Sequence, residues 1–157
     1  MQLYEPQQHR AHAALYSEHD AGVCCRMQAA QCLWLLGYPD QAVASMQAAL
    51  ALAQQLAHPM SLTVALYSAA MLCHLRREAL LAQAQAEAAM TIATDQGFPE
   101  HVARATPLRG WALAASGQRE EGIAQIHQGL AAYQMTGVMA VPHKEKIAKI
   151  LLNTSNI

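Results

Sequence analysis

The stretch Leu33-Trp-Leu-Leu-Gly-Tyr-Pro-Asp-Gln-Ala-Val-Ala-Ser-Met-Gln-Ala-Ala-Leu50 decides the fold. It combines the signals of a helix end, a tight turn and a second helix. Gly37 suits a left-handed cap at the end of the first helix. Pro39 and Asp40 are both favoured in the first turn of the next helix. The stretch therefore predicts a helical hairpin.

The outline of this hairpin returns at offsets of 40 and 80 residues. Small residues correspond to small ones and apolar residues to apolar ones, as in the sets Ala30, Ala70 and Gly110; Ala42, Ala82 and Gly122; Ala49, Ala89 and Gly129; Leu50, Met90 and Leu130. A fixed period of this size is typical of helical-repeat proteins, in which stacked hairpins bury together what none buries alone. The expected fold class is all-α, a right-handed α-solenoid of about three hairpins.

Start and stop signals place the hairpin helices at residues 21–36 and 39–56, 60–75 and 78–95, and 99–116 and 118–135. The turns fall at Gly37, Arg77 and Gly117, and Asp20 is expected to cap the first helix. We expect one domain over residues 1–157, with repeats at about 20–57, 58–97 and 98–137 and partial helices at 6–17 and 142–152. Pro107 predicts a kink near Ala103, because proline lacks an N–H and its ring crowds the preceding turn.

Composition narrows the class of protein. Apolar residues make up 54% of the chain, charged residues 13% and aromatic residues 5%, so the core is expected to consist of Ala, Leu and Met. The net charge of -1 gives no basic surface for nucleic acid. No run approaches the roughly 18 apolar residues of a membrane span, and the N-terminus lacks signal-peptide features. We expect a cytoplasmic protein that binds neither nucleic acid nor membrane.

Motifs for catalysis or metal binding are not found in the sequence. Cys24, Cys25 and Cys32 fall on one predicted helix, a poor disulfide framework, and reduced, mostly buried thiols are expected. His9 and His12 share a helical face, but the Cys and His spacings of a zinc module are missing. Phosphate-binding, dinucleotide-binding and hydrolase motifs are missing too. We therefore expect a protein that is not an enzyme and has no cofactor or metal.

The pattern of Ala30, Leu33, Gly37, Ala42, Ala49 and Leu50 resembles the tetratricopeptide repeat (TPR), although the period of 40 is longer than the standard TPR unit. Three segments are similar to the long C-terminal TPR arrays of bacterial signalling proteins, in which a nucleotide cyclase and a STAND-type ATPase precede the repeats: Leu33 to Ala42, Leu75 to Glu78 and Arg109 to Ala114. The resemblance covers roughly residues 1–138.

The resemblance implies that the first helix of each pair lines a concave face. Carried over by position, that face would hold Met27, Gln31, Trp34, Tyr67, Met71, His74, Arg104 and Trp111. Aromatic and Met side chains with a few polar groups suit a peptide groove or small-ligand pocket, and Arg104 can pair with a carboxylate. The alternative is that Trp34 and Trp111 fill gaps between hairpins, since amphipathic spacing alone predicts a core face.

The leading functional hypothesis is a non-catalytic protein–protein interaction scaffold that binds a peptide or protein segment on its concave face. The alternative is a small-ligand-sensing module of a bacterial signalling or regulatory protein. A homodimer through apolar end faces is a further hypothesis, because terminal repeats lack a neighbour to cover them. The candidate end-face residues are Leu3, Leu15, Ile147, Ile150 and Leu151.

Overall fold

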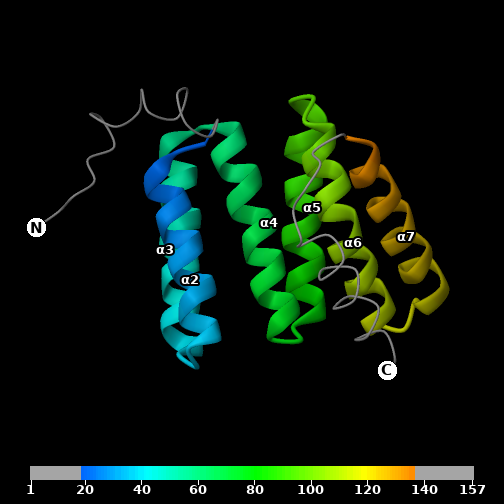
Figure 1. Cartoon of the computed structure of the whole chain (residues 1–157), viewed down its shortest axis with the longest axis horizontal. Helices are drawn as coiled ribbons and strands as arrows, with labels where there is room; N and C mark the ends of the chain where they lie inside the picture. The colour runs from blue at the N-terminus through cyan, green and yellow to red at the C-terminus, as the bar shows by residue number, and fades with distance from the viewer. Residues whose placement is uncertain (1–18, 137–157) are drawn as a thin grey trace, which may run out of the picture. The chain divides into compact units, whose positions relative to one another are not determined.

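The structure is a computed structural model that describes residues 19–136 (Figure 1). This part of the chain is all-α and consists of α2 (Ala21–Leu35), α3 (Pro39–Leu56), α4 (Pro59–Leu75), α5 (Ala79–Asp95), α6 (Pro99–Ala115) and α7 (Arg119–Met135). The expected helices agree with these bounds to within one residue at each end. The partial helices expected at 6–17 and 142–152 lie outside the described residues.

The turns inside the hairpins repeat every 40 residues in the backbone as well as in the sequence. Gly37, Arg77 and Gly117 have positive φ angles of 84°, 60° and 97°. In each turn this residue's N–H bonds the carbonyl three residues earlier, and the next N–H bonds the carbonyl five residues earlier, at 2.9–3.2 Å. This is the Schellman arrangement that closes a helix C-terminus. The three expected turns are confirmed, and Arg77 holds without glycine a conformation that favours glycine.

Packing divides the chain into two units, residues 1–68 and 69–157. In the first unit α2 packs against α3 through small and apolar side chains, among them Val23, Ala30, Ala42 and Ala49, which are fully buried. Such small residues let two helices approach closely, so their return at a 40-residue spacing explains why each pair forms a hairpin.

The start of α2 is fixed by Asp20. Its carboxylate accepts a hydrogen bond from the Val23 N–H at 3.0 Å, which confirms the expected N-cap. Its own N–H donates to Ser61 Oγ at 2.9 Å, and both residues are buried. This contact joins the first turn of α2 to the first turn of α4.

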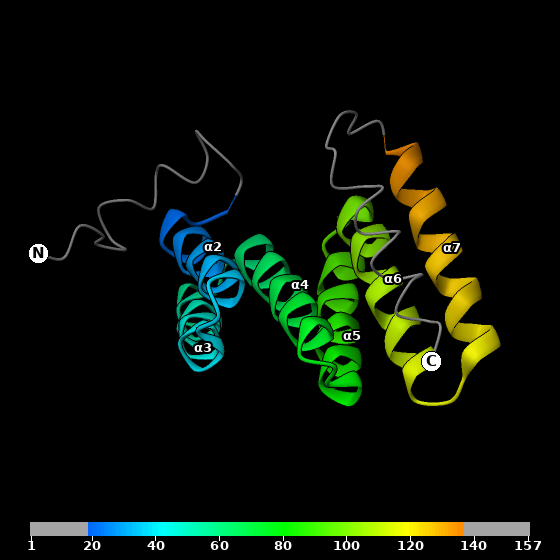
Figure 2. The same ribbon diagram turned by 60° about the horizontal axis from the view of Figure 1, so that its bottom comes forward.

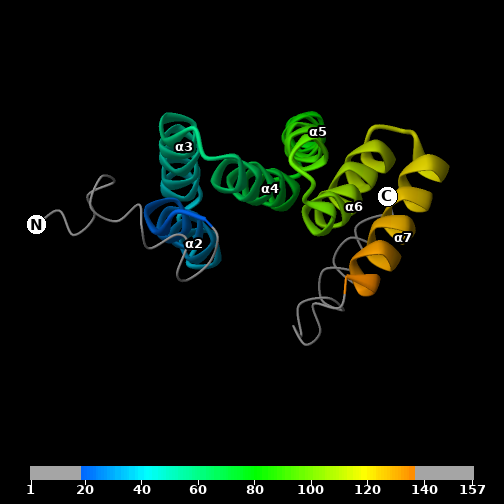
Figure 3. The ribbon, with the colours of Figure 1, turned by 90° about the horizontal axis from the view of Figure 1, so that it is seen from above.

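In the second unit α6 packs against both α5 and α7, as Figures 2 and 3 show. The backbones of α6 and α7 come close together, because a Cβ on Gly110 would lie 2.6 Å from the Gly122 carbonyl oxygen. The helix α6 continues through Pro107, whose ring lies against α7. A Cβ on Gly129 would meet Pro107 Cδ at 2.5 Å, so Gly129 provides the room that the ring needs. The kink expected near Ala103 stays a prediction.

No helix between residues 19 and 136 combines the length and the apolar character needed to cross a bilayer.

Candidate functional site

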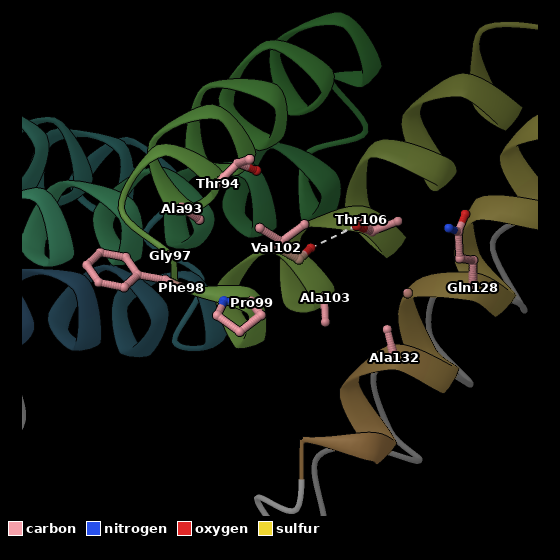
Figure 4. Close-up of a pocket in the computed structure, with 11 residues that line it drawn as sticks. Ala93, Thr94, Gly97, Phe98, Pro99, Val102, Ala103, Thr106, Gln128 and Ala132 are labelled. Carbon is pink, nitrogen blue, oxygen red and sulfur yellow. Dashed lines mark hydrogen bonds between the residues drawn. The ribbon is translucent and has the colours of Figure 1, made fainter.

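The second unit contains an open groove of about 410 Å³ between α5 and α7, with α6 as its floor (Figure 4). It is bordered by the end of α5, the loop that follows, the first half of α6 and one face of α7. The lining residues are Ala93, Thr94, Gly97, Phe98, Pro99, Val102, Ala103, Thr106, Gln128, Gly129 and Ala132. Most of them are small or apolar, so the groove suits an apolar side chain.

The floor and one wall of the groove come from residues spaced three or four apart. Val102 and Thr106 lie on one face of α6, and Gln128 and Ala132 lie on one face of α7, because positions i and i+4 share a helical face. The Thr106 hydroxyl donates to the carbonyl oxygen of Val102 at 2.8 Å (Figure 4). Its hydrogen is therefore engaged within α6, and the floor presents little hydrogen-bonding demand to a bound group.

A polar bridge crosses from α5 to α7 about one helical turn beyond the groove floor. Arg109 follows Thr106 on the same face of α6. Arg109 Nε donates to Glu87 Oε1 of α5 at 2.8 Å, and its Nη1 donates to Gln125 Oε1 of α7 at 2.6 Å. Hydrogen bonds from Gln83 and Arg109 hold the pKa of Glu87 below its usual value, so this carboxylate stays charged. The bridge ties the three helices together next to the groove.

The expected concave-face residues are divided between the two units. Met27, Gln31, Trp34 and Tyr67 lie in the first unit, and Met71, His74, Arg104 and Trp111 lie in the second. Met27, His74 and Trp111 are buried, whereas the other five are half-buried. The three buried side chains act in packing, and the assignment of the other five to a binding face stays a prediction.

The structure brings two of the expected residues together. The rings of His74 and Trp111 meet edge to face, with centroids 4.4 Å apart and planes at 83°. His74 is 3% exposed and Trp111 2% exposed. Neither ring nitrogen of His74 nor Trp111 Nε1 has a hydrogen-bond partner. Burial, with a smaller effect of Arg77, lowers the pKa of His74 to about 4, so the imidazole is neutral at pH 7.

Arg104 has a carboxylate near it, from its own helix. Its Nη1 lies 3.9 Å from Glu100 Oε1, one turn earlier in α6. Both side chains are about one-third exposed, and such a pair contributes on the order of 0.3–0.5 kcal/mol.

The sequence analysis missed the groove residues Val102, Thr106, Gln128 and Ala132. Their four-residue spacing was present in the sequence, but nothing in it set them apart from other positions on amphipathic helices. The pairing of Pro107 with Gly129 was the available signal. Proline within a helix and glycine at a position that holds alanine in the other two hairpins are both unusual in a helix interior.

The cysteines differ from expectation. Cys25 and Cys32 are exposed, and Cys24 and Cys73 are half-buried. The prediction of mostly buried thiols is wrong for Cys25 and Cys32, because the face of α2 that carries them is open to solvent. Among residues 19–136 no three His, Cys, Asp or Glu side chains are grouped so that they can hold a metal ion.

Comparison with known proteins finds no matching family model, no matching curated protein and no matching solved structure.

Proposed function

We propose that this chain is a non-catalytic interaction scaffold of the TPR type, whose hairpins form a right-handed α-solenoid. Two observations support the repeat architecture. The left-handed turn residues recur every 40 residues, at Gly37, Arg77 and Gly117. The buried small residues of the second helices recur at the same interval, as at Ala42, Ala82 and Gly122. Repeats of this kind supply extended surfaces for contact with other proteins.

The observation that carries the proposal is the groove between α5 and α7. Thr94, Gln128 and Ala132 line it and are exposed, so their side chains are available to a partner. Its volume of about 410 Å³ matches one or two apolar side chains. A small ligand is normally enclosed over most of its surface, whereas this groove is open. A peptide can place an apolar side chain in the groove while its backbone stays hydrated, and we therefore assign the groove to an apolar peptide segment of a partner protein.

The test uses two neighbouring alanines of α7. Ala132 lines the groove and Ala131 does not, and both are exposed. A peptide selected from a random display library on the full chain is expected to carry an apolar anchor. Ala132→Glu should weaken its binding at least tenfold, because a charge would stand beside the apolar side chain. Ala131→Glu should leave the affinity within twofold.

Two results would contradict the groove assignment. One is the failure of any library peptide to bind the folded chain above background. The other is a selected peptide whose affinity falls equally in the two glutamate variants. Circular dichroism of both variants confirms that helix content is retained, so that a loss of binding reports on the groove.

A small-ligand-sensing module is the second candidate. It is favoured by the buried His74 and Trp111 rings, whose nitrogens lack hydrogen-bond partners, since a small polar ligand entering between them would supply partners. A thermal-shift screen of metabolites distinguishes the two functions, because a ligand of the folded state raises the melting temperature by mass action. A shift that persists in Ala132→Glu and is lost in His74→Leu would favour the sensor.

A further inference from the structure

One face of α2 is apolar, uncharged and open to solvent. Its residues share one side of the helix, with spacings of three and four. They are Ala21, Cys25, Gln28, Ala29, Cys32, Leu35 and Leu36, and all seven are exposed. Leu35 is 82% exposed and Leu36 69%. Large apolar side chains this exposed at the end of a continuous apolar face indicate a surface that another element covers.

The same positions are covered in the other two hairpins. The α4 residues 40 positions later are buried at Ser61, Ala65, Ser68, Ala69 and Leu72. Ala105, Leu108 and Ala112 of α6, 80 positions later, are buried too. In α6 the covering helix is identified by Arg109, which reaches Glu87 of α5 at 2.8 Å. The face belongs, in the repeat, to the helix that precedes it along the chain.

We propose that residues 6–17 of this chain form a helix that covers this face of α2, in the position that α5 holds against α6. Subtracting 80 from the contact of Arg109 with Glu87 gives Ala29 opposite Gln7. Residues 96–98 join α5 to α6, and residues 18–20 are a connection of the same length before Ala21. Residues 6–17 also supply small side chains at positions 11, 13 and 14, all alanine, to meet Cys25 and Ala29.

The size of the face decides between this segment and a second copy of the chain. A helix of 15 residues is about 22 Å long, so its covered face amounts to on the order of 200–300 Å². A stable interface between two proteins needs about 800 Å² from each partner. A segment joined to α2 by three residues needs far less, since its effective concentration is in the millimolar range.

Thiol chemistry tests the proposal, because Cys25 and Cys32 lie on the face. In the full chain under native conditions, both should react with iodoacetamide at least tenfold more slowly than in urea, as measured by peptide mass spectrometry. The protection should not change with protein concentration. Ala11→Pro, which breaks the proposed helix, should restore fast labelling of both thiols. Gln2→Pro, placed before that helix, should not. Cys73 reports that the rest of the fold is intact, because its half-buried thiol should keep its wild-type rate in both variants.

Three results would overturn the proposal. Cys25 and Cys32 reacting in the native wild-type chain as fast as in urea would show that nothing covers the face. Protection that appears only at concentrations where light scattering detects a dimer would assign the face to a second copy. Protection that survives Ala11→Pro in a monomer would show that another element covers it.

Discussion

Replacing Arg77 by glycine should stabilise the protein. Arg77 has φ of 60°, while the equivalent turns use Gly37 and Gly117. A Cβ at either glycine would have no neighbour within 4 Å, so a side chain at these turns costs backbone strain and no steric clash. The left-handed conformation costs a non-glycine residue about 1–2 kcal/mol. The greater freedom of glycine in the unfolded chain takes back about 0.4–1 kcal/mol. The expected net gain is roughly 0.5–1 kcal/mol.

Urea unfolding followed by circular dichroism measures this gain. The midpoint should rise with an unchanged m-value, and the melting temperature should rise by about 1–4 °C. Arg77→Ala is the matched control, because it removes the same side chain but keeps a Cβ in the left-handed turn. Gly117→Ala should lose about what Arg77→Gly gains. If Arg77→Gly were no more stable than Arg77→Ala, backbone strain would not be the cost at this turn.

Three further predictions concern the second unit. Gly129→Ala should destabilise the fold by about 1–2 kcal/mol, because overpacking outweighs helix propensity, and the loss should shrink by at least about 1 kcal/mol in a Pro107→Ala background; additive urea-unfolding values would contradict this coupling. The free energy of unfolding should fall by about 3 kcal/mol as the pH drops from 6.5 towards 4, because unfolded His74 takes up a proton that the buried ring refuses until about pH 4; this dependence should be weaker in His74→Leu, and equal slopes would refute it. Arg109→Ala should cost about 1 kcal/mol by releasing Glu87 and Gln125, with a melting temperature about 2–4 °C lower; an unchanged melting temperature would show that the bridge does not stabilise the unit.

The hairpins could be predicted from the sequence because their signals are local. The turn at Gly37 depends on a residue suited to positive φ, and the start of α3 depends on Pro39 in the first turn. Both effects act within a few residues of the chain. The turn at Arg77 carries no such local signal and was placed by the 40-residue interval alone, which shows that tertiary packing of the repeat imposes the conformation there.

The candidate site was not predictable in the same way, because it depends on pairs far apart in the sequence. Arg109 meets Glu87 from 22 residues away, and nothing in either residue's neighbourhood indicates the other. The same limit applies to His74 and Trp111. Their residue types suit a binding face, yet the packing of α4 and α6 buries both rings against each other. Burial of an aromatic or histidine side chain is set by which helix faces it, and helix periodicity alone does not specify that neighbour.

The groove and the irregularity of α6 have a common origin. Pro107 occupies the position that Met27 and Tyr67 hold in the earlier hairpins, and Gly129 occupies the position of Ala49 and Ala89. The missing side chain at position 129 serves two purposes, since it admits the proline ring and it widens the groove that the same glycine lines. A regular repeat with alanine at this position would close part of that space. The departure from the repeat pattern therefore falls where the candidate binding surface lies, which is where local irregularity is expected if the third hairpin is specialised for contact with a partner.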